Sequence, residues 1–256
     1  MKAAEMILKL LNRLFSFALA SMLLAAASFS GYVLWDEHQV TESARAVQRS
    51  IQTYRPAEPG TGETASPASF EQLQALNPDI CAWLSLSDTK IDYPVVQGRM
   101  NGEYLSKDVY GGYALAGSIF LDARNSRQFE DAILLVSGHN VSSGEMFADL
   151  VKYEDADFFE KNGEGLLQTP ERAWKLNVFA VMHAPAKEEL IFDPEFAAEN
   201  RSLLLDYVEK HALQMESEML TALQTDGGKI LVLTTCVNGP DENKRRIVLA
   251  AMEDMR

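Results

Sequence analysis

A cysteine near the C-terminus and two arginines form a pattern suited to acyl transfer. Cys236 ends an apolar run that begins at Ile230, and Arg245 and Arg246 precede a second apolar run that begins at Ile247. Neither run alternates with polar residues, which predicts two strands buried on both faces. If these strands pair antiparallel, the thiol and a guanidinium lie at the same end of the pair. A thiolate can then attack a carbonyl, and the cation can stabilise the charge that develops on its oxygen.

A histidine also follows a predicted strand. Residues 133–136 form a short apolar run, and His139 lies in the polar segment that comes directly after it. A cysteine nucleophile needs a partner that exchanges protons, and histidine is the usual one near neutral pH. His139 is therefore the candidate acid and base. The remaining histidines have other settings, next to the apolar N-terminal segment, after a strand and on a helix: His38, His183 and His211.

These residues stand in motifs that resemble those of sortases, and of class B sortases in particular. The family's strand end, histidine turn and following arginine match Leu233-Thr234-Thr235-Cys236, Gly138-His139-Asn140 and Arg246. Further matching segments, in the family's order, cover residues 77–84, 91–97, 116–122 and 146–150, so the likeness extends from about Phe70 to the C-terminus. Successive side chains on a strand point to opposite faces, so only one of the two arginines can face the thiol. The family spacing selects Arg246.

One segment departs from the pattern of many class B members. The loop after Cys236, residues 237–241, reads Val-Asn-Gly-Pro-Asp and lacks their aromatic and acidic residues. In the family this loop helps to shape the substrate groove. The departure therefore bears on the choice of peptide and not on the chemistry.

The resemblance implies a fold and an activity. The fold is mainly β, a closed eight-stranded sortase-type β-barrel with peripheral helices. The activity is that of a cysteine transpeptidase, which cleaves a C-terminal sorting signal of the Asn-Pro-x-Thr type after Thr and transfers the protein to an amine of the cell wall. Cys236 would attack the Thr carbonyl, His139 would protonate the leaving amine and deprotonate the incoming one, and Arg246 would hold the peptide and stabilise the oxyanion. The substrate-binding residues would be Thr234, Thr235 and Val237, the last through its backbone N–H.

Three alternatives remain open from the sequence. A pilin-polymerising sortase would use a Lys of another pilin subunit as acceptor, although many of those enzymes carry a second, C-terminal hydrophobic segment that this chain lacks. A secreted cysteine protease would use water, but papain-like enzymes place Cys before His, the reverse of the order here. A non-enzymatic membrane-tethered scaffold would require all three catalytic positions to be accidental.

The N-terminal region predicts a membrane anchor. Residues 14–35 contain no charged residue, and as a helix they would span roughly 33 Å, enough to cross a bilayer core. Basic residues precede this segment and acidic ones follow it: Lys2, Lys9 and Arg13, then Asp36 and Glu37. This asymmetry predicts a single-pass protein of the cell membrane, with a cytoplasmic N-terminus and an extracellular catalytic domain. A signal peptide cleaved near residues 25–28 is the alternative.

The chain is expected to have three parts. Residues 1–36 form the cytoplasmic tip and anchor, residues 37–68 an amphipathic juxtamembrane helix with a flexible spacer, and residues 69–256 the catalytic domain. A short helix is expected after Ser69, and one long helix is expected to begin at Asp193, a good N-cap followed by Pro194. The predicted strands cover residues 82–86, 91–96, 118–121, 133–136, 175–182, 230–235 and 246–252.

The net charge and the cysteine content argue against some classes of partner and site. The formal net charge of −14 argues against a nucleic-acid partner. A disulfide between the two cysteines would consume the nucleophile, so Cys81 is expected to be a free, buried thiol. The scattered histidines suggest no metal site, and we expect no cofactor. The expected partners are secreted proteins with a sorting signal, an acceptor amine and the membrane.

Overall fold

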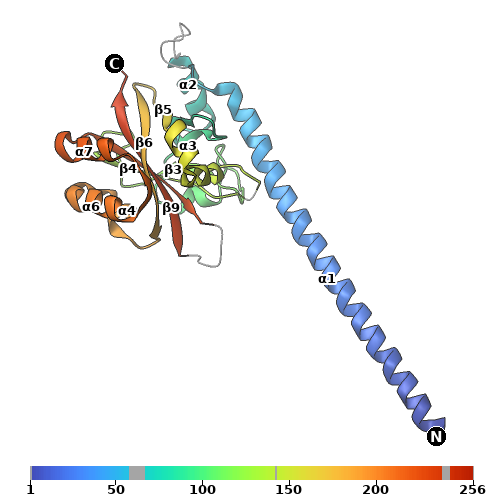
Figure 1. Cartoon of the computed structure of the whole chain (residues 1–256). Coiled ribbons are helices and arrows are strands. Elements are labelled where there is room, and N and C mark those ends of the chain that lie inside the picture. The colour runs from blue at the N-terminus through green and yellow to red at the C-terminus, as the bar shows by residue number, and fades with distance from the viewer. Residues whose placement is uncertain (1, 58–66, 142, 238–242, 256) are drawn as a thin grey trace. The chain divides into compact units, whose positions relative to one another are not determined.

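The computed structural model describes residues 2–57, 67–141, 143–237 and 243–255 (Figure 1). The chain divides into two compact units, Met1–Glu42 and Ser43–Arg256, which we treat separately. One helix, α1 (Lys2–Ile51), makes up the first unit and ends in the second. The predicted anchor and the juxtamembrane helix are thus continuous. Large apolar side chains of the first unit, such as Phe17 and Leu24, are exposed, and the helix is long and apolar enough to cross a membrane.

The second unit is built on one sheet that closes into a barrel. Its strands follow the order β5-β1-β2-β3-β4-β8-β9-β6-β7, and an additional pairing of β5 with β6 closes the first eight into a ring. The ninth, β7, pairs with β6 outside this ring. The predicted eight-stranded barrel is therefore confirmed. The bounds are β1 Ile80–Leu86, β2 Asp92–Val96, β3 Ile119–Leu121, β4 Ile133–Ser137, β5 Glu164–Gln168, β6 Ala173–Pro185, β7 Ala212–Met215, β8 Lys229–Cys236 and β9 Lys244–Asp254.

The strands that matter most for the site lie in the middle of this order. β4 and β8 are parallel, and β8 and β9 are antiparallel. As predicted from their unbroken apolar runs, the residues from Ile230 to Thr235 and from Ile247 to Ala251 are buried. Alternate residues of these strands, including Val232 and Leu249, pack on the helices that cover one side of the sheet. The candidate residues Cys236 and His139 thus follow the buried parts of β8 and β4.

The helices lie around the barrel and connect its strands. They are α2 Pro67–Leu76, α3 Ala156–Lys161, α4 Glu189–Phe192, α5 Pro194–Glu199, α6 Arg201–His211 and α7 Ser217–Asp226, with 3-10 turns η1 Gln52–Tyr54, η2 Glu103–Leu105 and η3 Ala148–Glu154. Figure 1 shows α4, α6 and α7 gathered on one side of the sheet.

The prediction of one long helix from Asp193 is wrong in one respect. Asp193 does cap a helix, because its carboxylate accepts from the backbone N–H of Phe196 at 3.1 Å, and Pro194 is the first helical residue. However, α5 ends at Glu199 and α6 begins at Arg201, because Asn200 leaves the helical conformation with φ −111° and ψ 36°. In α6, Leu204, Leu205 and Val208 are buried, whereas Leu203 is exposed.

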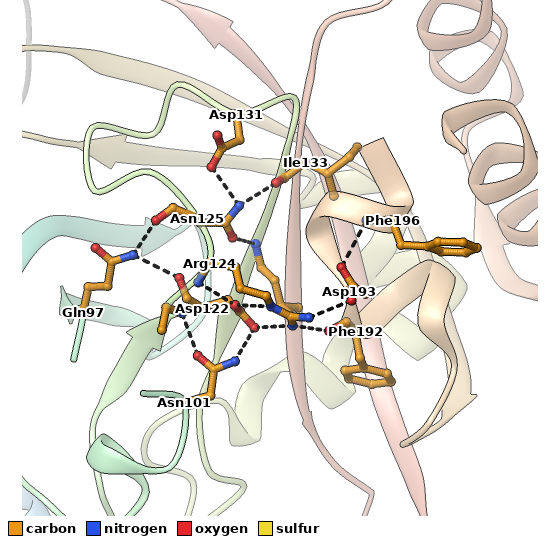
Figure 2. A network of polar contacts seen from close by, with 12 residues as sticks. Gln97, Asn101, Asp122, Arg124, Asn125, Asp131, Ile133, Phe192, Asp193 and Phe196 are labelled. Carbon is orange, nitrogen blue, oxygen red and sulfur yellow. Dashed lines mark hydrogen bonds and ion pairs between the residues drawn. The ribbon is translucent and has the colours of Figure 1, made fainter. Parts of the chain in front are cut away.

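A polar network ties these helices to the barrel (Figure 2). Arg124, just after β3, donates to Asp122 and to the carbonyl of Phe192, and it pairs with Asp193 at 2.9 Å. Asp122 is buried and also accepts from Asn101 at 2.6 Å. The side chain that caps α5 is therefore anchored to the end of β3, which fixes the helical layer against the strands next to the site.

Candidate active site

The parallel pairing of β4 and β8 brings Cys236 and the His139 turn together. Ser137 of β4 lies opposite Thr234 of β8, and His139 and Cys236 each come two residues later. The N–H of Gly138 donates to the carbonyl of Thr234 at 3.1 Å. Asn140, the next residue after His139, donates from Nδ2 to the carbonyl of Cys236 at 3.0 Å. The two candidate catalytic residues therefore lie at one edge of the barrel.

Cys236 is the last residue of β8, and its side chain is exposed and free of any disulfide. Thr234 and Thr235 before it are buried. Val237 follows it, and its N–H, expected to donate to the oxyanion, donates to the carbonyl of Lys244 at 3.3 Å. An oxyanion role for this N–H would require that weak bond to open. The rest of the loop, including Asn238 to Asp241, lies outside the described residues.

Three contacts restrict the position of His139. Its Nε2 lies 2.8 Å from the carbonyl oxygen of Leu105, and because a carbonyl only accepts, this bond places a proton on Nε2. Its own carbonyl accepts from the N–H of Phe147 at 3.0 Å. Gly117, at φ +60°, packs so closely that a Cβ there would lie 3.0 Å from the ring Cδ2 of His139 and 2.7 Å from the carbonyl of Tyr104. Only glycine fits this position, so the ring is confined and its Nδ1 is left to exchange protons.

The two arginines lie on opposite faces of β9, as expected, but the register favours the other one. Arg245 is directly opposite Cys236, and Arg246 is opposite Thr235. Paired residues of neighbouring strands share a face, so Arg245 shares the face of the thiol. Arg246 has the spacing of the family motif, yet it points to the other face, where it is only 4% exposed.

Arg246 is the buried member of an ionic cluster whose other members, Glu154 and His183, are partly exposed. Its Nε lies 2.5 Å from Oε1 of Glu154, and Nε2 of His183, opposite Arg246 on β6, lies 2.8 Å from the same oxygen. Burial alone would raise the pKa of Glu154, but the hydrogen bonds from Arg246 and His183 outweigh it and lower that pKa. Glu154 is therefore a carboxylate at neutral pH, and it holds the guanidinium in place.

Some hydrogen-bonding capacity is left over at this edge. Within the described part of the chain, Oγ1 of Thr234, Oγ1 of Thr235 and Nη1 of Arg246 are buried without a partner. Buried polar atoms are seldom left unpaired, because desolvation without a hydrogen bond is costly. A bound peptide could supply partners for these atoms only after side-chain rotation, since each is closed off from solvent.

Three residues of this arrangement were missed from the sequence. Asn140 belongs to the recognised Gly-His-Asn motif, so its position was marked although its role as a partner of Cys236 was not. Leu105 acts through its backbone carbonyl, which no side-chain pattern reveals. Glu154 lies 92 residues before Arg246, and nothing in its local sequence points to that pairing.

Two residues set aside from the sequence, Cys81 and His211, have no part in the contacts described above, whereas His183 belongs to the Arg246 cluster. Cys81 is buried in β1, where it donates to the carbonyl of Val95 at 3.4 Å. Burial raises the pKa of its thiol to about 12, so it is not a nucleophile near neutral pH. His211 is exposed at the end of α6, and its Nδ1 lies 2.8 Å from the carbonyl of Tyr207.

Several known proteins are similar to this chain in both sequence and fold. A sequence model of the Sortase domain family matches residues 84–253. Sortase B of Listeria monocytogenes is 34% identical over 181 residues, which cover 70% of this chain and 72% of that protein. A class B sortase of Streptococcus pyogenes involved in pilus biogenesis has a TM-score of 0.64 at 34% identity, covering 72% of this chain and 97% of that one. Sortase B of Bacillus anthracis, in complex with AAEK1, has a TM-score of 0.71 at 26% identity, covering 85% and 99%. A family match that spans nearly the whole barrel, and relatives that are about a third identical over the aligned part, show that this chain belongs to the sortase family of transpeptidases, as a class B sortase.

Proposed function

We propose that this sortase is a membrane-anchored cysteine transpeptidase that cleaves a C-terminal sorting signal after Thr and transfers the protein to an amine of the cell wall. The observation that carries the proposal is the bond from Asn140 to the carbonyl of Cys236, which brings the His139 turn beside the exposed thiol. The expected signal is of the Asn-Pro-x-Thr type. The proposed location is the outer face of a Gram-positive-type membrane, with α1 as the anchor and its N-terminus in the cytoplasm.

The reaction would proceed in two acyl transfers. The thiolate of Cys236 attacks the Thr carbonyl carbon and forms a tetrahedral intermediate with a negatively charged oxygen. That intermediate collapses to a thioester as the peptide C–N bond breaks, and His139 donates a proton to the leaving amine. The incoming amine then attacks the thioester and gives a proton to His139. A new amide bond forms as the C–S bond of the thioester breaks, and Cys236 leaves as a thiolate beside the protonated His139.

The oxyanion needs a cation, and two arginines compete for that role. The family spacing favours Arg246, which is held by Glu154 on the face opposite to that of the thiol. The strand register favours Arg245, which lies directly opposite Cys236. We assign the role to Arg246 on spacing, with Arg245 as the rival that mutation must exclude.

Pilin polymerisation is the second candidate. It is favoured by the likeness to the Streptococcus pyogenes class B sortase, which is involved in pilus biogenesis. The two functions share the thioester and differ only in the acceptor amine, a wall cross-bridge or a Lys of a pilin subunit. A secreted protease would differ from both, because water would be its acceptor.

The deciding experiment uses the full chain in detergent micelles with a panel of sorting-signal peptides. Without an amine, intact-mass measurement should reveal an acyl adduct on Cys236. With hydroxylamine, a wall cross-bridge mimic or a pilin-derived Lys peptide, the Thr-terminal fragment should appear as a hydroxamate or a new amide. Comparison of the two amine rates separates wall anchoring from pilin assembly. Release of free acid alone, unaffected by any amine, would replace the transpeptidase with the protease.

A further inference from the structure

The end of α1 packs against the barrel next to His139. Ala44 and Ile51 on this helix are buried. They line a small cavity together with Gly117 and Met146, which come from the two segments that flank His139. Residues 43–51 belong to the same compact unit as the barrel. They nevertheless lie outside residues 84–253, which the family model matches.

A first polar contact joins the helix to the turn that follows His139. Nε of Arg45 lies 2.7 Å from Oε1 of Glu145, whose side chain is 6% exposed. The turn is narrow, since Asn140 and Met146 form a β-bridge and the N–H of Phe147 donates to the carbonyl of His139 at 3.0 Å. A displacement of Glu145 would therefore be passed to His139 through the backbone.

A second contact joins the helix to the segment on the other side of the ring. The hydroxyls of Ser50 and Tyr110 are 2.7 Å apart. Tyr110 lies in the connection between η2 and β3, where Leu105 supplies the carbonyl that binds the His139 ring and Gly117 packs against that ring. The two segments that flank the His139 ring therefore both contact residues 45–50 of α1.

The ionic contact is well placed to carry this coupling. Burial would raise the pKa of Glu145, but hydrogen bonds from Ser143 and Arg45 prevail and lower it. The carboxylate therefore stays charged at neutral pH. Loss of Arg45 would leave the buried Glu145 charge without its guanidinium partner, which destabilises the present position of Glu145.

We propose that residues 43–51 brace the active site, with Arg45 and Glu145 as positioning residues that set the geometry of His139. The inference rests on the proposed function, because it assumes that His139 moves the proton. In this arrangement the geometry of the catalytic histidine depends on the segment that joins the barrel to the rest of α1. The barrel alone is then not the complete catalytic unit.

A double-mutant cycle in the full chain tests the brace. Arg45→Gln and Glu145→Gln should each lower kcat about 10-fold with little change in KM, since a misplaced catalytic group can cost up to about 100-fold. The double variant should be no slower than the slower single variant, because coupled residues are non-additive. Arg49→Gln is the matched control: it removes an exposed arginine one turn further along the same helix and should leave kcat unchanged.

A second readout distinguishes positioning from simple loss of stability. The chain has four histidines, so its imidazole NMR signals are few and can be assigned by single substitutions. In folded Arg45→Gln, the signals of His139 should shift while those of His183 and His211 stay in place. Thermal unfolding of each variant establishes that the compared enzymes are folded.

The outcomes separate the brace from the proposed function. Wild-type kcat with unmoved His139 signals in Glu145→Gln, which keeps the size of the side chain, would overturn the brace, and so would additive effects in the cycle. Glu145→Gln decides the matter alone if Arg45→Gln does not fold. An inactive His139→Ala enzyme beside a normal Arg45→Gln enzyme would remove the brace only. An active His139→Ala enzyme would instead remove the proposed function.

Discussion

The two faces of the β8–β9 pair are organised in opposite ways at the end that carries Cys236. On one face Cys236 is exposed and lies opposite Arg245. On the other face Thr235 lies opposite Arg246, and both are buried above the Glu154 carboxylate. The first, open face exposes Cys236 to solvent, whereas on the second, closed face the buried Arg246 pairs with the partly exposed Glu154. Residues adjacent in sequence therefore meet different environments, and motif spacing alone does not reveal which face a residue occupies.

Removal of the exposed thiol should have the largest effect. Cys236→Ala should lower kcat/KM by about 10⁴-fold or more, because loss of a covalent nucleophile leaves only binding and oxyanion stabilisation. Cys81→Ala is the matched control and should retain most activity. A thiol-specific methanethiosulfonate reagent should label Cys236 and spare Cys81 in the native protein. Turnover in Cys236→Ala would contradict the assignment of the open face as the reacting one.

His139 and His183 belong to the strands that flank the β8–β9 pair, since His139 follows β4 and His183 lies on β6. His139→Ala should lower kcat/KM by about 10³-fold, within the range of general acid–base catalysis. His183→Ala removes an imidazole of the closed cluster and should leave a folded enzyme active. Turnover of the two variants, measured beside circular dichroism, checks this. An inactive but folded His183→Ala enzyme beside an active His139→Ala enzyme would reverse the roles of the two faces.

Substitution of each arginine tests which face of β9 supplies the catalytic cation. Arg246→Gln should lower kcat/KM by about 10²-fold, as removal of an oxyanion-stabilising group does, while Arg245→Gln should be mild. The measurement is kcat/KM of both variants, with thermal unfolding to separate catalytic from structural loss because Arg246 is buried. The opposite pattern would mean that the face seen in the register, and not the family spacing, identifies the catalytic cation.

The smallest expected effect on activity comes from Glu154, and it should be seen mainly in stability. At neutral pH, Glu154→Gln should lower the free energy of unfolding by about 1–3 kcal/mol, less than for a fully buried pair because the Glu154 side chain is 29% exposed. The hydrogen bonds from Arg246 and His183 hold the folded-state pKa of Glu154 below the ordinary value of a glutamate carboxyl. Its contribution is thus present above that value and is lost as pH falls through the lowered pKa.

Urea unfolding of both proteins between pH 3 and pH 7 measures this contribution. The difference between wild type and Glu154→Gln should be constant near neutral pH and should shrink in acid. A difference that does not depend on pH would show that Glu154 acts by packing and not by charge.

Much of the barrel could be predicted from local patterns. All seven predicted strands exist, and Asp193 caps a helix as expected. The strands that were missed, β5 and β7, are short and read Glu-Gly-Leu-Leu-Gln and Ala-Leu-Gln-Met. They lack the β-branched and aromatic residues that mark strands, and pairing with β6 overrides their weak preference.

The candidate site was predicted in part. Cys236 and His139 could each be placed just after a buried strand, because strand ends were readable from the sequence. That the two strand ends lie at one edge came from the parallel pairing of β4 and β8. The partners that hold the site could not be read in this way. Asn140, Leu105 and Glu154 act through a carbonyl contact, a backbone oxygen and a distant ion pair, and none of these leaves a periodic signal.

The local sequence was sufficient to identify the candidate catalytic residues, but contacts between distant segments set how they face one another. Apolar runs, caps and turn residues are local properties, so the strands ending at Cys236 and before His139 follow from neighbouring residues. The side of the sheet on which Arg245 and Arg246 lie depends on the register between strands, where a shift of one residue reverses every side chain. The contacts of Glu154 with Arg246 and of Arg45 with Glu145 span 92 and 100 residues, and such contacts exist only once the barrel has closed.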